Sequence, residues 1–134
     1  MIDLHNKSPR ILVIGDLIID QYLWGSCDRI SPEAPVQIVN IDSENVVLGG
    51  AGNVVNNLKS LGAKVDVISV VSDSKNSEIL RELLEEIGVD TKYLITQKNR
   101  IDSKKSRIIS SQQQVVRFDH ESTEEIDIKS QKLL

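Results

Sequence analysis

The chain has 134 residues, 40% of them hydrophobic, and a formal net charge of −4, which is typical of about one globular domain with its own core. The negative charge argues against nucleic acid as a partner, because a nucleic-acid-binding protein presents a basic face. No apolar run approaches the length of a membrane-spanning helix, and the single Cys27 cannot form an intramolecular disulfide, so we expect a cytoplasmic protein without membrane contact.

The N-terminal half predicts a strand, a set of extended segments and then a helix. Residues 10–15 (RILVIG) are a short β-branched run, typical of a buried strand in a parallel sheet. Residues 21–48 lack a helical period, so we expect strands there, with turns at Ser31–Pro35 and at Asp42–Asn45. From Ala51 onward the apolar residues follow helical spacing, and we expect a helix that begins there.

The C-terminal half alternates strands and helices before it reaches a hairpin. The expected elements are a strand at 65–71, a helix at 74–87, a strand at 93–95, a hairpin of strands 104–110 and 113–120, and a helix from Asp127. The β-α-β-α-β order predicts an α/β domain with a parallel sheet. The two hairpin-like segments do not fit between parallel strands, so we expect them to form a separate small sheet over one end.

The stretch VLGGAGNVVNNL (residues 47–58) carries three glycines in four residues, directly before the predicted helix. A Walker loop requires Gly-Lys-Ser/Thr, a tripeptide that the sequence lacks. A dinucleotide-binding fingerprint requires Gly-x-Gly-x-x-Gly directly after the first strand, which this stretch does not follow. The pattern therefore argues against a nucleotide phosphate at these glycines.

Polar residues near this stretch suit a different ligand. Asp16 and Asp20 follow the first predicted strand, and Gly49, Gly50 and Asn53 open the predicted helix, whose first N–H groups have no partner within it. In α/β sheets, ligands bind beyond the carboxyl ends of the strands, where these segments would meet. Carboxylates accept hydrogen bonds from hydroxyls, and a carboxamide both donates and accepts, so the set predicts a sugar site. Taken singly, each residue favours a role in a turn or a helix cap over a role in a site.

Several motifs together resemble a known family. The series Gly15-Asp16-x-x-x-Asp20, RISPEAPV (29–36) and Gly49-Gly50-Ala51-x-Asn53 resembles the ribokinase-type sugar kinases. The RISPEAPV segment is similar to a narrower group, the kinase half of the bacterial bifunctional D-glycero-β-D-manno-heptose 7-phosphate kinases/heptose 1-phosphate adenylyltransferases. Lys105-x-Arg107 and Gln113-Gln114-x-x-Arg117-x-Asp119-x-Glu121 fit the same group. The resemblance extends from Arg10 to Glu121, nearly the whole chain.

The resemblance implies a ribokinase-like α/β fold, with a parallel, Rossmann-like core sheet and a small β-sheet lid over approximately residues 22–48 and 104–120. It assigns the binding of sugar hydroxyls to Asp16, Asp20, Gly49, Gly50 and Asn53. Arg107 and Arg117 are possible partners of the 7-phosphate, because a guanidinium matches phosphate geometry. From the residues alone, Arg117 and Asp119 fit an exposed pair better than a binding site.

The implied reaction is ATP-dependent phosphorylation of heptose 7-phosphate at C1, with Mg²⁺, for ADP-heptose and lipopolysaccharide core biosynthesis. The catalytic base, the ATP site and the adenylyltransferase domain are expected beyond residue 134. Residues 1–134 then resemble the truncated N-terminal portion of one kinase domain. We expect this portion to be inactive alone and to contain no catalytic residue or metal ligand. We expect the protein to be a homodimer. A kinase of another sugar or nucleoside, and a non-catalytic sugar-binding or oligomerisation module, stay open as alternatives.

Two departures from the family pattern affect the expected shape of the lid. Ser72 stands after the second core strand, where relatives usually carry glycine. Ile101-Asp102 replaces the usual Pro-Thr before the Lys-x-Arg strand.

Overall fold

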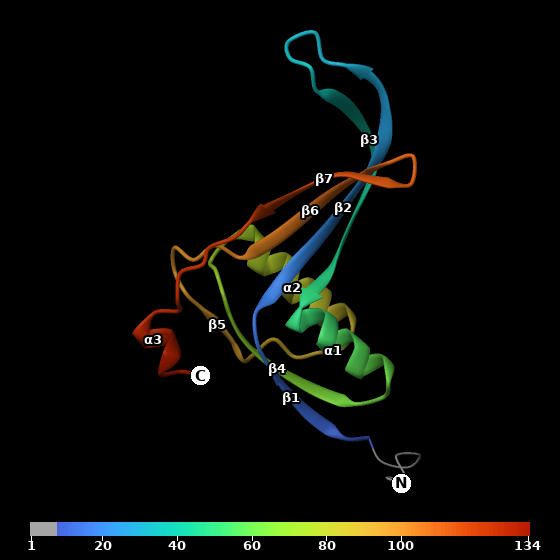
Figure 1. Cartoon of the computed structure of the whole chain (residues 1–134). Coiled ribbons are helices and arrows are strands. Elements are labelled where there is room, and N and C mark those ends of the chain that lie inside the picture. Colours follow the sequence, from blue (N-terminus) through green and yellow to red (C-terminus); the bar gives the residue numbers. More distant parts are fainter. Residues whose placement is uncertain (1–7) are drawn as a thin grey trace.

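The computed structural model describes residues 8–134, which form two sheets and the helices that pack beside them (Figure 1). The smaller sheet, which we call the core sheet, has the order β1–β4–β5 with parallel pairing throughout. Its strands are β1 (Arg10–Ile14), β4 (Lys64–Val71) and β5 (Leu94–Thr96). The parallel sheet predicted from the apolar runs is confirmed.

Two amphipathic helices cover one face of the core sheet. They are α1 (Ala51–Ser60) and α2 (Lys75–Glu86), and a short helix α3 (Ile128–Gln131) follows at the C-terminal end. Ser74 caps α2, because its Oγ accepts a hydrogen bond of 3.2 Å from a first-turn amide. The fully buried side chains between the helices and the sheets include Ile19, Val55, Val67, Leu80 and Leu84.

The second sheet, which we call the lid sheet, has the order β3–β2–β6–β7. Its strands are β2 (Leu17–Ile30), β3 (Gln37–Gly50), β6 (Ser103–Ser110) and β7 (Gln113–His120). The β2–β3 and β6–β7 pairs are antiparallel hairpins, and a parallel β2–β6 pairing joins them. The far end of the β2–β3 hairpin extends well away from the core sheet (Figure 1). The expectation that both hairpins form a separate sheet is confirmed.

Two details of the first hairpin differ from the sequence analysis. The turn predicted at Asp42–Asn45 is wrong, because these residues lie within β3, where Asn45 pairs with Tyr22. Asp, Ser and Asn favour turns locally, but here β2 supplies the backbone partners that keep them extended. β2 also begins at Leu17, which places Asp20 in the lid sheet instead of the loop after β1.

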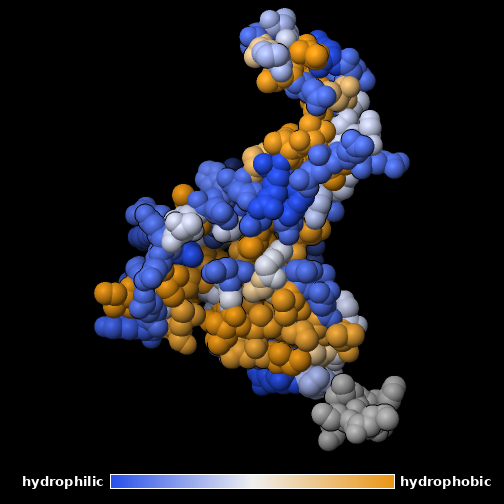
Figure 2. Space-filling model, in the orientation of Figure 1, coloured by the Kyte–Doolittle hydropathy of each residue, from blue (hydrophilic) through white to orange (hydrophobic). Residues whose placement is uncertain are grey.

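The opposite face of the core sheet is exposed. Leu12 and Ile14 of β1 are 53% and 65% exposed, and Tyr93 is 44% exposed. Figure 2 shows a broad hydrophobic area over this part of the molecule. Parallel sheets are normally covered on both faces, so this surface is suited to further packing. Among the helices of residues 8–134, none is long and apolar enough to cross a membrane.

Candidate functional site

The loop after β1 and the start of α1 lie side by side, where the core sheet meets the lid sheet. The amide of Ala51 donates a hydrogen bond of 2.9 Å to the backbone carbonyl of Asp16. Gly50 has a positive φ of 56°, and a Cβ on it would lie 2.7 Å from the same carbonyl oxygen. Glycine is therefore required at this position by both backbone conformation and space.

Asp20 forms an ion pair across the lid sheet with Arg107. The Nη1 of Arg107 donates to the Oδ1 of Asp20 over 2.6 Å, and the two side chains are only 19% and 20% exposed. The other carboxylate oxygen of Asp20 lies against Gly49, where a Cβ would overlap it. A partly buried, charge-assisted hydrogen bond of this kind fixes both side chains. Gly49 provides the space in which the Asp20 carboxylate sits.

Two aromatic rings of β2 lie beside the ion pair of Asp20 and Arg107. The guanidinium of Arg107 lies 5.2 Å from the centroid of the Tyr22 ring, and the Tyr22 and Trp24 rings stack at 5.7 Å. Because alternate residues of a strand point to the same side, these rings share a face with Asp20. Arg107 thus contacts both a carboxylate and an aromatic ring.

The same face carries further charges on β6 and β7. Lys105 lies opposite Asp119, and Arg107 lies opposite Arg117. Arg117 donates to Asp119 over 2.6 Å, and this hydrogen bond holds the pKa of the Asp119 carboxyl below its usual value. The face therefore carries both cations and carboxylates, with the two arginines opposite each other, and Arg117 forms the ion pair with Asp119 that the sequence favoured. We call this surface the lid face, and its members are Asp20, Tyr22, Trp24, Lys105, Arg107, Arg117 and Asp119.

Four of the five residues predicted to bind a sugar meet at this junction. Asp16, Asp20, Gly49 and Gly50 are brought together by the contacts described above. Asn53 follows in the first turn of α1, two residues after Ala51, with an exposed side chain. An open cavity of about 390 Å³ adjoins Asp16 and is lined also by Arg100, Glu124, Glu125, Ile126 and Gln131. Within the described residues, no group of His, Cys, Asp and Glu side chains is placed to hold a metal ion.

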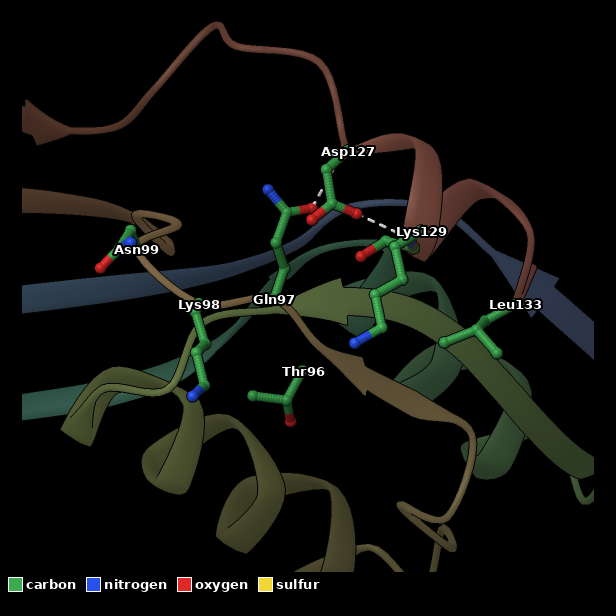
Figure 3. A pocket seen from close by; sticks show the side chains of 8 residues that line it. Thr96, Gln97, Lys98, Asn99, Asp127, Lys129 and Leu133 are labelled. Atoms are coloured by element: carbon green, nitrogen blue, oxygen red, sulfur yellow. Dashed lines mark hydrogen bonds between the residues drawn. The ribbon is translucent and has the colours of Figure 1, made fainter.

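A second cavity of about 390 Å³ lies beside the end of β5 (Figure 3). Lys98 and Lys129 line it together with Asp127, which caps α3 by accepting a hydrogen bond of 2.6 Å from the amide of Ser130. The amide of Asp127 donates to Gln97 over 3.1 Å. None of the predicted site residues lines this cavity, and most of its lining is exposed surface.

Sequence reasoning assigned no role to Asp102, which is only 5% exposed. It accepts hydrogen bonds from Ser72 and also lines a small gap of about 10 Å³ next to Asp16. The signal in the sequence was the pair of departures from the family pattern, at Ser72 and Asp102, two positions that the structure brings into contact.

Comparisons with known proteins agree with the resemblance. A family model described as pfkB family carbohydrate kinase matches residues 8–133. The chain is 61% identical over 127 residues to the bifunctional protein HldE of Aliarcobacter butzleri (strain RM4018), which covers 95% of this chain and 27% of that protein. The bifunctional protein HldE of Sulfurimonas denitrificans is 58% identical over 127 residues, with the same coverage of 95% and 27%. The chain thus spans about a quarter of the length of the curated relatives it matches.

Solved structures resemble the chain at low sequence identity. A ribokinase from Cryptococcus neoformans var. grubii serotype A in complex with ADP gives a TM-score of 0.59 at 21% identity, covering 84% of this chain and 34% of that chain. An Arabidopsis thaliana ribokinase complexed with ribose and ATP gives 0.63 at 15% identity, covering 84% and 36%. A Burkholderia thailandensis nucleoside kinase in complex with inosine gives 0.57 at 15% identity, covering 82% and 36%. These likenesses confirm the predicted ribokinase-like α/β fold.

Proposed function

We propose a function from one established premise: this chain belongs to the pfkB family of carbohydrate kinases. In our proposal it is the N-terminal, sugar-binding part of a kinase that phosphorylates D-glycero-β-D-manno-heptose 7-phosphate at C1, giving the 1,7-bisphosphate for ADP-heptose and lipopolysaccharide core biosynthesis. The observation that carries the proposal is the lid face, where carboxylates suited to hydroxyls lie beside guanidinium groups suited to a phosphate. The identity of 61% to a protein named bifunctional protein HldE supports it.

The hydroxyl groups of the sugar are assigned to the junction of the two sheets. Asp20 uses one carboxylate oxygen for Arg107 and retains lone pairs on the other for a sugar hydroxyl. Asp16 lies beside the start of α1, where Gly49 and Gly50 let the backbone approach a ligand closely. Asn53, on the first turn of α1, would contact the sugar from the exposed side of that helix.

The 7-phosphate is assigned to Arg107 and Arg117. A guanidinium has five N–H donors, so Arg107 can keep its bond to Asp20 and still donate to a phosphate. The guanidinium group of Arg117 would donate to the phosphate either together with the Asp119 carboxylate or in its place. Lys105, on the same face, adds a third positive charge.

In this proposal ATP supplies the transferred phosphoryl group, with Mg²⁺ bound to its phosphates. Among the described residues, no cluster of side chains is placed to hold the metal ion. Our proposal therefore assigns Mg²⁺, the nucleotide and the general base to the part of the kinase that this chain does not cover. The 134-residue chain alone is therefore expected to release no ADP in response to the sugar.

We further propose that the kinase works in the cytoplasm as a homodimer. β3 and β7 are the edge strands of the lid sheet, and an exposed edge strand presents unpaired backbone groups to a second chain. No nucleic-acid or membrane partner is part of the proposal.

The test uses this chain joined to the remaining part of the Aliarcobacter butzleri relative, with heptose 7-phosphate, ribose and adenosine as substrates in an ADP-release assay. Phosphorylation of heptose 7-phosphate alone is the expected result. Use of ribose or adenosine instead would overturn the substrate assignment in favour of another sugar or nucleoside. Binding without phosphorylation would favour a non-catalytic sugar-binding module.

A substitution then tests the sugar site. Asp20→Ala is expected to raise the KM for the sugar roughly 5- to 150-fold and to leave the KM for ATP unchanged. The reason is that the sugar hydroxyl loses its carboxylate acceptor, which costs about 1–3 kcal/mol for a buried group. The control is Asp28→Ala, which removes an exposed carboxylate from the far end of the same strand. Unchanged sugar kinetics in Asp20→Ala would remove this residue from the site.

A further inference from the structure

Asp102 lies at the centre of a buried hydrogen-bond network outside the proposed sugar site. Its Oδ1 accepts a hydrogen bond of 2.7 Å from the amide of Ser72, and its Oδ2 accepts one of 2.5 Å from the Ser72 hydroxyl. The hydroxyl of Ser74 lies 3.3 Å from the same Oδ2. Ser72 is 1% exposed and Asp102 is 5% exposed. A carboxylate that is so well shielded from water depends on these donors.

The network joins the two sheets. Ser72 directly follows β4 of the core sheet, and Ser74 is the N-cap of α2. Asp102 directly precedes β6, whose first residue, Ser103, pairs with Ile18 of β2. The hydrogen bond from Ala51 to the Asp16 carbonyl joins the start of α1 to the loop between β1 and β2. The beginning of β6 is thus fixed to the core sheet by the Asp102 carboxylate.

The position of β6 matters because this strand carries Arg107. From Ser103 the strand runs parallel to β2, which sets Arg107 opposite Tyr22 and within 2.6 Å of Asp20. Asp102 and Asp16 also line the same gap of about 10 Å³, so little space separates the network from the loop after β1. A shift at the beginning of β6 would move Arg107 relative to Asp20.

Ser72 and Asp102 lie 30 residues apart in sequence, and two hydrogen bonds link them, one from the backbone amide and one from the hydroxyl of Ser72. Because both oxygens of the Asp102 carboxylate accept from Ser72, the two residues act as a pair.

We propose that Asp102, paired with Ser72, is a positioning residue that fixes strand β6 and sets Arg107 against the sugar phosphate. This inference rests on the proposed function. Asp102 touches neither sugar nor nucleotide in this proposal, and it acts through the strand that follows it.

The test compares Asp102→Ala, Ser72→Gly and the double variant in the joined enzyme described above, with the exposed Asp73→Ala as the matched control. We expect Asp102→Ala to raise the KM for heptose 7-phosphate about 10- to 100-fold, as a small misplacement of a binding group does, with an unchanged KM for ATP. The double variant should be little worse than Asp102→Ala, because the two side chains act together. If Asp102→Ala does not fold, Asp102→Asn keeps one oxygen for the Ser72 amide and should show a smaller change in the same direction.

Hydrogen exchange of the ligand-free enzyme separates this inference from the proposed function. Faster exchange in β6 of the Asp102 variant, with unchanged exchange in β1 and α1, is expected. A loss of kcat with both KM values unchanged, or equally faster exchange throughout the core sheet, would show a general stability role and overturn the inference. If the unsubstituted enzyme does not phosphorylate heptose 7-phosphate, the proposed function fails. Unchanged hydrogen exchange in β6 of the Asp102 variant would overturn the inference as well.

Discussion

Gly49 leaves the space that the Asp20 carboxylate of the proposed sugar site occupies. A Cβ at this position would overlap the Oδ2 of Asp20 and lie 3.3 Å from the Cβ of Ile18. Gly49→Ala should therefore displace the Asp20 carboxylate from Arg107 and raise the KM for the sugar about tenfold, a loss near 1.4 kcal/mol. Steady-state kinetics of the joined enzyme measures this effect.

Gly62→Ala is the control for Gly49→Ala. Gly62 has a φ of 87° and open space around it, so alanine there strains the backbone without touching the site. It should lower the free energy of unfolding and leave the KM for the sugar unchanged. A sugar KM that is the same in Gly49→Ala as in the unsubstituted enzyme would show that Asp20 does not need its present position.

Ser69 of β4 carries the other unusual group at the residue scale. It is 3% exposed, and its Oγ is buried without a hydrogen-bond partner among the described residues. Ser69→Ala should raise the free energy of unfolding by about 1 kcal/mol, because an unsatisfied buried hydroxyl costs about 1–3 kcal/mol. Chemical denaturation of the chain measures the change.

The matched control for Ser69→Ala is Ser77→Ala. Ser77 is also buried, at 6% exposed, but its Oγ donates to the carbonyl of Ser74 over 2.8 Å. Removing this hydroxyl should destabilise the chain by about 1 kcal/mol, the net value of one hydrogen bond. If both alanines destabilise equally, Ser69 has a partner, such as a bound water molecule.

At the scale of elements, the β2–β3 hairpin divides into an anchored base and a far end. Ile19 and Leu48 belong to the hydrophobic core, so the base is held by packing. The strand register shifts between Trp24 and Gly25, where a Cβ on Gly25 would overlap the carbonyl of Asn40. Beyond Gly25, β2 pairs with β3 and no longer with β6, whose last partner on β2 is this glycine.

Gly25→Ala should separate the two strands beyond this point and leave the base in place. The expected cost is about 1–3 kcal/mol, which is typical of overpacking. Hydrogen exchange should become faster for the amides of residues 26–40 and stay the same near Ile19. Unchanged protection at the far end would mean that the strands adjust around the new methyl group.

At the scale of the whole molecule, the exposed face of the core sheet determines how the chain behaves in solution. Leu12 and Ile14 point to the face that α1 and α2 leave uncovered, at 53% and 65% exposed. We expect the 134-residue chain to self-associate through this face, because an apolar sheet surface of this kind is rarely left in water. Light scattering over a concentration series measures the association.

The double variant Leu12→Lys/Ile14→Lys should reduce the association, since charges on this face oppose its burial. Leu61→Lys is the control, because Leu61 is 83% exposed at the end of α1, away from the sheet. A monomer at high concentration in the unsubstituted chain would contradict the prediction. Equal association in both variants would assign the contact to another surface, such as the edges of the lid sheet.

The sequence by itself determined the elements whose signal is local. The apolar runs predicted β1 and β4, and helical spacing predicted α1 and α2. These patterns are short in range, because a strand or an amphipathic helix shows its buried side every second, third or fourth residue. The order of the elements then predicted a parallel core sheet and a separate small sheet.

Only the tertiary structure decided which side chains meet. Asp20 and Arg107 are 87 residues apart and come together because β2 and β6 pair in parallel, in a register that no local pattern sets. Asp42–Asn45 stays extended because β2 is beside it, although its composition favours a turn. Ser72 and Asp102 appeared in the sequence as two unrelated departures, and their contact depends on where β5 leads the chain back to the end of β4. Partners supplied by distant segments carry no signature in the neighbouring residues, so the geometry of the candidate site required the fold.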